Sequence, residues 1–282
     1  MRGYQRQYLR HLYILFSFSL LFMQGCARPA LQTYPASELQ IATALEAFAR
    51  YQEISTAACS CCLDAEADGA LSVSGWFSDH TEKVSGFLQA MKPGYLKFIV
   101  INPLGQPLFV FLTDGSMFTS LNILKEKAYS GSVHSDTYRK FAPPGFEPGF
   151  SYYWLTGRVR PGEIQVQGVM SDREGEKFWL QIKHADASTE SMVLFDPGEL
   201  VISRSILRDE QGRHVVDILY AEHQVVLPGN EPCRIPRRIT VSSNADDVKV
   251  ELRLHSFLDE VRFSADDFQI EIPDNFEQLL VK

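Results

Sequence analysis

The sequence has 282 residues, 45% of them hydrophobic, and a formal net charge of −8. It contains no basic run, and since nucleic-acid phosphates are bound by clustered Lys and Arg, this composition argues against nucleic-acid binding. The length is sufficient for one large domain or two small ones.

The first 26 residues have the pattern of a bacterial lipoprotein signal. Three arginines occur within the first ten residues, and residues 12–23 form an uncharged, mostly apolar run. This run is too short to span a bilayer but has the length of a signal-peptide core. It ends in Met23-Gln24-Gly25-Cys26, which resembles the lipobox in which the cysteine is acylated. The resemblance implies removal of residues 1–25 and membrane anchoring through Cys26, because several acyl chains hold a protein where one would be marginal.

The residue after Cys26 indicates to which membrane the lipoprotein is sorted. In enteric lipoproteins, an Asp directly after the acylated cysteine is the signal for retention in the inner membrane. This chain has Ala27 instead, which favours the outer membrane. The alternative is ordinary secretory cleavage with an incidental cysteine. We expect residues 26–36 to be a lipidated tether and residues 37–282 to be a single domain.

One amphipathic helix and many short strands are predicted after the tether. The helix begins at Pro35 or Ser37 and continues to about Ala58, because apolar residues recur at helical spacing. A short helix-like segment at 135–141, with Ser135 as N-cap, and a break at 150–155 interrupt the strands. The strands are predicted at residues 71–77, 83–88, 95–101, 107–112, 117–121, 128–133, 164–169, 178–182, 192–195, 200–207, 215–220, 238–241, 248–254 and 268–272. Their spacing predicts a mainly β fold with a few helices, as a single curved antiparallel sheet or partial barrel.

The loop between the predicted strands 95–101 and 107–112 holds an apolar residue among turn-formers. Its sequence is Asn102-Pro103-Leu104-Gly105, so the chain reverses here and Leu104 lies at or near the tip. A leucine at a loop tip gains nothing in water. Either it folds back onto the sheet, or it points outward and meets an apolar surface.

The remaining cysteines are Cys59, Cys61, Cys62 and Cys233. In an oxidising compartment we expect a disulfide between Cys233 and one of the first three. Cys59 and Cys62 form a Cys-x-x-Cys that follows the predicted helix instead of starting one, which disfavours a redox role. Three cysteines within four residues are not a usual zinc spacing, so no metal is expected.

Motifs of enzymes are not found. The sequence has no Gly-x-Ser-x-Gly, His-Glu-x-x-His or glycine-rich phosphate loop. His134-Ser135-Asp136 contains the residue types of a catalytic triad, but adjacent residues cannot adopt its geometry. We therefore expect a non-enzymatic protein without a cofactor.

Three segments in series resemble the outer-membrane lipoprotein receptor family LolB. The first is Gly75-Trp76-Phe77, the second is the strand and loop 95–105, and the third is Tyr153-Trp154-Leu155-Thr156-Gly157-Arg158. Together they cover roughly residues 70–160. The rest of the chain resembles the wider LolA/LolB-like group in its sequence pattern. This chain is longer than a typical LolB, mainly after residue 183.

The resemblance implies an open, incomplete antiparallel β-barrel of about eleven strands with a helical lid over an apolar cavity. Residues 39–54 and 138–141 would form the lid, and Leu104, with Asn102, Pro103 and Gly105, would form a membrane-contacting loop. Such a protein, expected to be a monomer, would accept acylated lipoproteins from a LolA-like periplasmic carrier and insert them into the outer membrane. The alternative is a lipid-binding or assembly-scaffold envelope lipoprotein of the same fold with a different cargo.

Candidate residues for lining the cavity are the larger apolar side chains of these strands, although ordinary core packing is an equally good interpretation of each. A one-residue slip in register would reverse every facing. The candidates are Trp76, Phe98, Val100, Phe109, Phe111, Trp154 and Trp179.

Overall fold

The computed structural model describes residues 31–58, 62–74, 79–142, 146–185, 190–208, 211–226, 233–243, 248–258 and 262–282. The predicted signal peptide lies outside these ranges, and so do some of the residues singled out from the sequence: Cys26, Cys59, Cys61, Gly75, Trp76 and Phe77.

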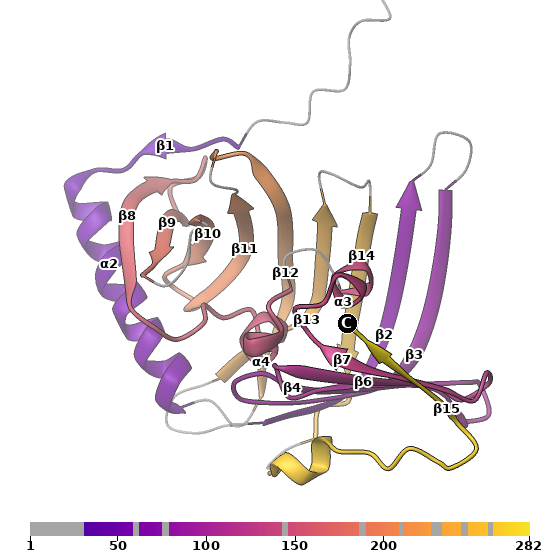
Figure 1. Ribbon diagram of the computed structural model, residues 1–282. Helices are drawn as coiled ribbons and strands as arrows, with labels where there is room; N and C mark the ends of the chain where they lie inside the picture. The colour runs from indigo at the N-terminus through magenta and orange to yellow at the C-terminus, as the bar shows by residue number, and fades with distance from the viewer. Residues whose placement is uncertain are drawn as a thin grey trace, which may run out of the picture.

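The described residues form one sheet of fifteen strands, in the order β1-β8-β9-β10-β11-β12-β13-β14-β2-β3-β4-β5-β6-β7-β15 (Figure 1). The strands are β1 (Tyr34–Pro35), β2 (Cys62–Ser74), β3 (Asp79–Met91), β4 (Tyr95–Ile101), β5 (Pro107–Thr113), β6 (Met117–Asn122), β7 (Lys127–Ser132), β8 (Ile164–Ser171), β9 (Phe178–His184), β10 (Glu190–Asp196), β11 (Val201–Arg208), β12 (His214–Val226), β13 (Cys233–Ser243), β14 (Val248–His255) and β15 (Glu277–Val281).

The prediction of a mainly β fold with few helices is confirmed. The prediction of about eleven strands is wrong, because short edge strands join the sheet at both ends and the long C-terminal half contributes its own hairpins. The sheet is not closed into a barrel, since β1 and β15 are its two edges. It curves strongly, and Figure 1 shows it bending around helix α4.

The inner side of this curve, here called the concave face, is the apolar side of strand β2. On β2, Ala65 and Ala67 point to the concave face, where they join the main buried cluster. The alternate residues of the same strand point outward and are polar. Asp68, for example, accepts hydrogen bonds on the outer face from Ser85 Oγ (2.6 Å) and pairs with His255 Nε2 (2.9 Å). One apolar and one polar face is the pattern of an antiparallel sheet covered on one side.

Helix α2 (Glu38–Glu53) covers part of the concave face. Ser37 is its N-cap, and Gln40 completes a capping box, which confirms one of the two predicted starting points. The chain continues as a π-helical turn, Ile54–Ala58. Phe48 and Tyr51 of α2 pack against Phe195 of β10, with ring centroids 5.4 and 5.5 Å apart, so the helix is fixed by aromatic packing.

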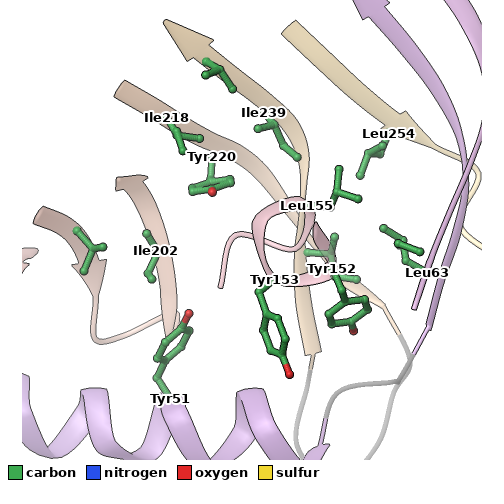
Figure 2. Packing of buried hydrophobic residues seen from close by; sticks show 14 of the residues in the cluster. Tyr51, Leu63, Tyr152, Tyr153, Leu155, Ile202, Ile218, Tyr220, Ile239 and Leu254 are labelled. Atoms are coloured by element: carbon green, nitrogen blue, oxygen red, sulfur yellow. The ribbon is translucent and has the colours of Figure 1, made fainter. Parts of the chain in front are cut away.

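Two shorter helices also contact this face. Helix α3 (Asp136–Phe141) begins at the N-cap Ser135, as predicted, and its Tyr138 packs against Phe118 and Phe111. The 3-10 turn η2 (Pro148–Phe150) leads into α4 (Ser151–Leu155), whose Tyr152 and Leu155 are fully buried. Figure 2 shows side chains from α2, α4 and the strands meeting in this common interior.

The segment predicted as a final strand at 268–272 is not one. The chain forms the 3-10 turn η3 (Ala265–Phe268) and then crosses the outer face of β4–β7, where Ile270, Ile272 and Phe276 pack on Val110 and its neighbours. Its alternating pattern arises from side-chain contact with one face and not from a hydrogen-bonded ladder. The following residues form β15, which pairs parallel with β7, whereas the other described strand pairs are antiparallel.

Cys62 and Cys233 are both disulfide-bonded and buried. They begin β2 and β13 respectively, close to the end of the π-helical turn. The predicted pairing of Cys233 with one cysteine of the 59–62 cluster stays a prediction.

Candidate functional site

The concave face is continuous across many strands. Strand registers place a row of side chains at one level: Ser205 pairs with Ile218, Ile218 with Val241, Val241 with Val250, and Val250 with Leu71. The row crosses the sheet perpendicular to the strands, from β11 to β2. It provides one uninterrupted, mostly apolar surface.

Part of this face is not covered by helices. Leu71 is 42% exposed and Val84, its diagonal neighbour on β3, is 37% exposed. Val250 and Leu252 beside them on β14 are half-buried. An open apolar patch therefore extends from the packed interior toward the free end of the β2–β3 hairpin.

Four of the predicted cavity residues lie together on the concave face. Phe98 pairs with Phe111, and Val100 pairs with Phe109, across β4 and β5. Val100 is buried, while the three phenylalanines are half-buried. The structure thus groups these residues on the hairpin that carries the Asn102–Gly105 loop.

The two described tryptophans on the candidate list differ in position. Trp154 of α4 packs edge-on against Phe146 and lines a small cavity. Trp179 of β9 belongs to a separate cluster with Met192 and Ile206, because its neighbours Phe178 and Leu180 are the ones that join the main cluster. Trp179 thus lies on the opposite face of β9 and does not line that cavity. On that opposite face, the guanidinium carbon of Arg204 lies 5.7 Å from the centroid of the Trp179 ring.

The small cavity lies between the segment 147–160 and the inner side of β9–β12, and its volume is about 90 Å³. It is lined by Glu147, Phe150, Tyr153, Trp154, Arg158, Val159, Arg160, His184, Ser191, Val193, Ser205, Leu207, Ile218 and Tyr220. A dry cavity of roughly 150 Å³ is what admits benzene, and drug-sized ligands occupy about 300 Å³ or more. Side chains of α2 and α4 fill most of the space in which an acyl-sized cavity was predicted, so a long chain fits only along the open patch or after these helices move.

Leu104 is at the tip of the β4–β5 hairpin and is 83% exposed, so it does not fold back onto the sheet. The Asn102 side-chain oxygen accepts hydrogen bonds from the backbone N–H groups of Leu104 (2.9 Å) and Gln106 (3.0 Å). Gly105 has φ 79°, a conformation that glycine adopts without strain. The turn chemistry therefore holds Leu104 outward.

The interior of the concave face is strongly desolvated. Burial raises the pKa of Tyr138 and of Tyr152 to about 12. Burial, reinforced by the positive charge of Arg158, lowers the pKa of Lys92, which lies 5.5 Å from the Tyr152 ring. Groups in this interior therefore favour their neutral forms.

Sequence reasoning missed the polar residues of the small cavity. Arg158 follows directly on the Trp154–Gly157 segment, which drew attention only for its resemblance, and a charged residue after a turn is normally solvated. Gly157 has φ 65°, and a side chain there would meet the ring of Tyr220 at 3.2 Å, so the turn lies tightly against β12. That packing draws Arg158 inward.

Neither a metal centre nor a spanning helix is found in the described part of the chain. Within it, no three His, Cys, Asp or Glu side chains cluster as metal ligands would. Likewise, no helix among these residues combines the length and hydropathy needed to cross a membrane.

Comparison with known proteins gives matches in structure only, because no protein-family model and no curated protein matches the sequence. A LolA superfamily protein from Nitrosomonas europaea is similar with a TM-score of 0.54 and 10% identity, over 80% of this chain and 97% of that one. A DUF1329 family protein from Desulfovibrio piger gives 0.55 and 12%, over 80% and 97%. A putative outer membrane lipoprotein-sorting protein domain from Vibrio parahaemolyticus gives 0.55 and 10%, over 80% and 96%. At these identities the likeness concerns the fold, and the chain therefore has a LolA-like fold.

Proposed function

We propose that this protein is anchored in the outer membrane through Cys26, binds the acyl chains of lipoproteins on its concave face, and releases them into the membrane at Leu104. It would receive its cargo from a LolA-like periplasmic carrier and would make or break no covalent bond. The fold shared with a lipoprotein-sorting domain supports this class of cargo.

The observation that carries the proposal is the position of Leu104 relative to the concave face. The hairpin that exposes Leu104 is lined on its concave side by Phe98, Phe109 and Phe111. An acyl chain leaving the sheet along these rings would remain on apolar atoms until it reached the loop. Each methylene exposed to water costs about 0.8 kcal/mol, so a continuous apolar path lowers the cost of transfer.

Transfer of a lipoprotein tests the proposal directly. Residues 27–282 contain all fifteen described strands and can be produced without the lipid anchor. Incubation with a lipoprotein bound to its periplasmic carrier is expected to move that lipoprotein onto this chain, measured by co-purification. Absence of transfer, together with co-purified phospholipid or glycolipid, would contradict the lipoprotein cargo and favour the alternative below.

Leu104→Glu is expected to reduce delivery of bound cargo to liposomes about tenfold or more while leaving cargo binding unchanged. Burying a leucine is worth about 1.5–3 kcal/mol, and a carboxylate at the same place opposes insertion. Release into liposomes is followed by flotation. Leu39→Glu is the matched control, because Leu39 is also an exposed leucine but lies in the first turn of α2. Equal delivery by both variants would mean that the loop is only a turn.

A second candidate function keeps the fold and changes the cargo to a lipid. The polar lining of the small cavity favours it, because an acylated cysteine carries only neutral ester and amide groups, whereas this cavity contains a cationic guanidinium.

A further inference from the structure

The small cavity is rich in hydrogen-bond donors. The lining residues that carry hydrogen-bond donors include Arg158, Trp154, His184, Ser191 and Ser205. The one carboxylate among the lining residues is that of Glu147, which is paired with Arg160 at 3.5 Å. The cavity therefore offers several donors to a guest, and its one carboxylate already has a cationic partner.

Only some of the hydrogen-bond donors of Arg158 have an acceptor among the described residues. Its Nη2 donates to Cys233 Sγ (3.1 Å) and to the backbone oxygen of Arg234 (3.4 Å). Its Nε and Nη1 are buried and have no hydrogen-bond partner among the described residues, and the same is true of Trp154 Nε1. A buried donor without a partner is costly, and a buried charge without a counter-charge is more so.

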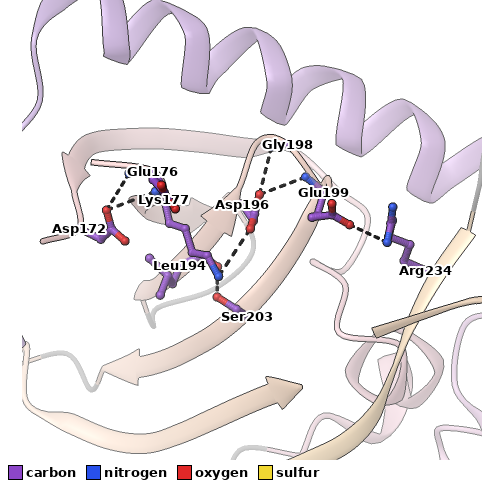
Figure 3. A network of polar contacts seen from close by, with 9 residues as sticks. All are labelled: Asp172, Glu176, Lys177, Leu194, Asp196, Gly198, Glu199, Ser203 and Arg234. Atoms are coloured by element: carbon purple, nitrogen blue, oxygen red, sulfur yellow. Dashed lines mark hydrogen bonds and ion pairs between the residues drawn. The ribbon is translucent and has the colours of Figure 1, made fainter. Parts of the chain in front are cut away.

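The neighbouring cation is already neutralised. Arg234 pairs with Glu199 at 2.6 Å, and Glu199 is held by Asp196, whose Oδ1 accepts from the Glu199 backbone N–H (Figure 3). The polar network of this region thus contains its own carboxylates. Arg158 stands outside it, with no carboxylate partner among the described residues.

We propose that the small cavity binds the anionic headgroup of an amphiphile, a carboxylate or phosphate whose oxygens accept from Arg158 and Trp154. Guanidinium binds both groups through paired, charge-assisted hydrogen bonds. The two serine hydroxyls on β10 and β11 face the same space. An anion satisfies the open donors and the charge together.

The volume limits the headgroup. About 90 Å³ is less than the roughly 150 Å³ that admits benzene, so the cavity suits a carboxylate or a phosphate better than a sugar headgroup. The row that begins at Ser205 and Ile218 of its lining and ends at Leu71 gives the tail a route once the side chains that cover Ile218 and Val241 move aside, because both residues are buried in this structure. Four strand spacings make this row roughly 19 Å long, which is of the order of a fatty acyl chain.

The headgroup site rests on the proposed function only because both place the acyl chain on the concave face. It identifies the ligand as an anionic amphiphile with a small headgroup.

Residues 27–282 are titrated with a fluorescent polyene fatty acid and with its methyl ester. The acid is expected to bind about ten- to a hundredfold more tightly than the ester. A second pair, lysophosphatidic acid against monoacylglycerol, separates a phosphate headgroup from a carboxylate, and inorganic phosphate alone separates an amphiphile from a free anion.

Arg158→Met is expected to lower affinity for the acid about ten- to a hundredfold and to leave affinity for the ester unchanged. Arg253→Met, which removes one positive charge on the outer side of β14, is expected to change neither. Trp154→Phe keeps an aromatic ring, although a smaller one, and loses one donor. It serves if Arg158→Met does not fold, and it should weaken binding of the acid alone.

Equal binding of acid and ester by the unaltered chain would overturn the headgroup site while keeping acyl binding on the concave face. Unchanged binding of the acid by Arg158→Met would do the same. Binding of neither probe would overturn the acyl-binding function itself. Competition by inorganic phosphate without any contribution of the acyl chain would reduce the site to a free-anion site.

Discussion

Placing charges on the open patch is expected to abolish most of the binding of acyl chains. Leu71→Glu combined with Val84→Lys puts a carboxylate and an ammonium on adjacent strands of the concave face, where the two native side chains are 42% and 37% exposed. Covering such side chains is worth about 1.5–3 kcal/mol each when complete, so losing the remaining part of both lowers affinity at least about tenfold. Net charge is unchanged, and the effect therefore measures lost apolar surface.

The matched control is Phe87→Glu. Phe87 is as exposed as Leu71, at 42%, and lies on β3 opposite Glu66, on the outer face. Affinity for a fluorescent acyl probe is measured for both variants, with circular dichroism to verify folding. Loss of affinity in Phe87→Glu of the same size as in the double variant would show that binding does not depend on which face is altered.

Unfolding between pH 10 and 12 is the second large effect. Tyr138 and Tyr152 have pKa values of about 12 in the folded chain because burial disfavours the phenolate. In the unfolded chain a tyrosine ionises near pH 10, so the unfolded state loses protons first and stability falls as pH rises above 10. The loss is about 2.3 kcal/mol for each tyrosine at pH 12, which together is a large fraction of the stability of a typical domain.

The transition is followed by circular dichroism and by the absorbance of tyrosinate in the same titration. Part of the rise in tyrosinate absorbance is expected to coincide with the loss of the circular-dichroism signal, since the buried phenols ionise more readily once the chain opens. Tyr152→Phe should shift the midpoint to higher pH, whereas Tyr34→Phe at the exposed edge strand should not. Ionisation of all tyrosines before any loss of structure would contradict the burial of these side chains.

Local patterns predicted much of the fold. Ser37 and Ser135 were identifiable as N-caps because a hydroxyl before a helix can accept from its first free N–H groups. The turn at Asn102–Gly105 was equally clear from its residue types. These features depend on neighbours in sequence, which is why sequence alone determines them.

Features that depend on which face of the sheet is covered by other segments were predicted poorly. At the start of β9, Phe178, Trp179 and Leu180 are all buried, so apolar residues do not alternate with polar ones there. Nothing in the sequence indicates that Trp179 faces away from its two neighbours. Residues 268–272 alternate like a strand, yet Ile270 and Ile272 only pack on a face that other strands already form. The burial of Arg158 likewise follows from how the α4 segment lies on β12 and β13, a contact across more than seventy residues.

The pairing of β15 with β7 has a consequence for how the chain folds. Glu277 lies beside Lys127, so this pair closes a loop of roughly 150 residues, and contacts so distant in sequence form slowly. Until they form, β7 presents a row of unpaired backbone groups to which another chain can add a strand. The period in which the newly made protein is prone to aggregate therefore lasts until its final strand arrives.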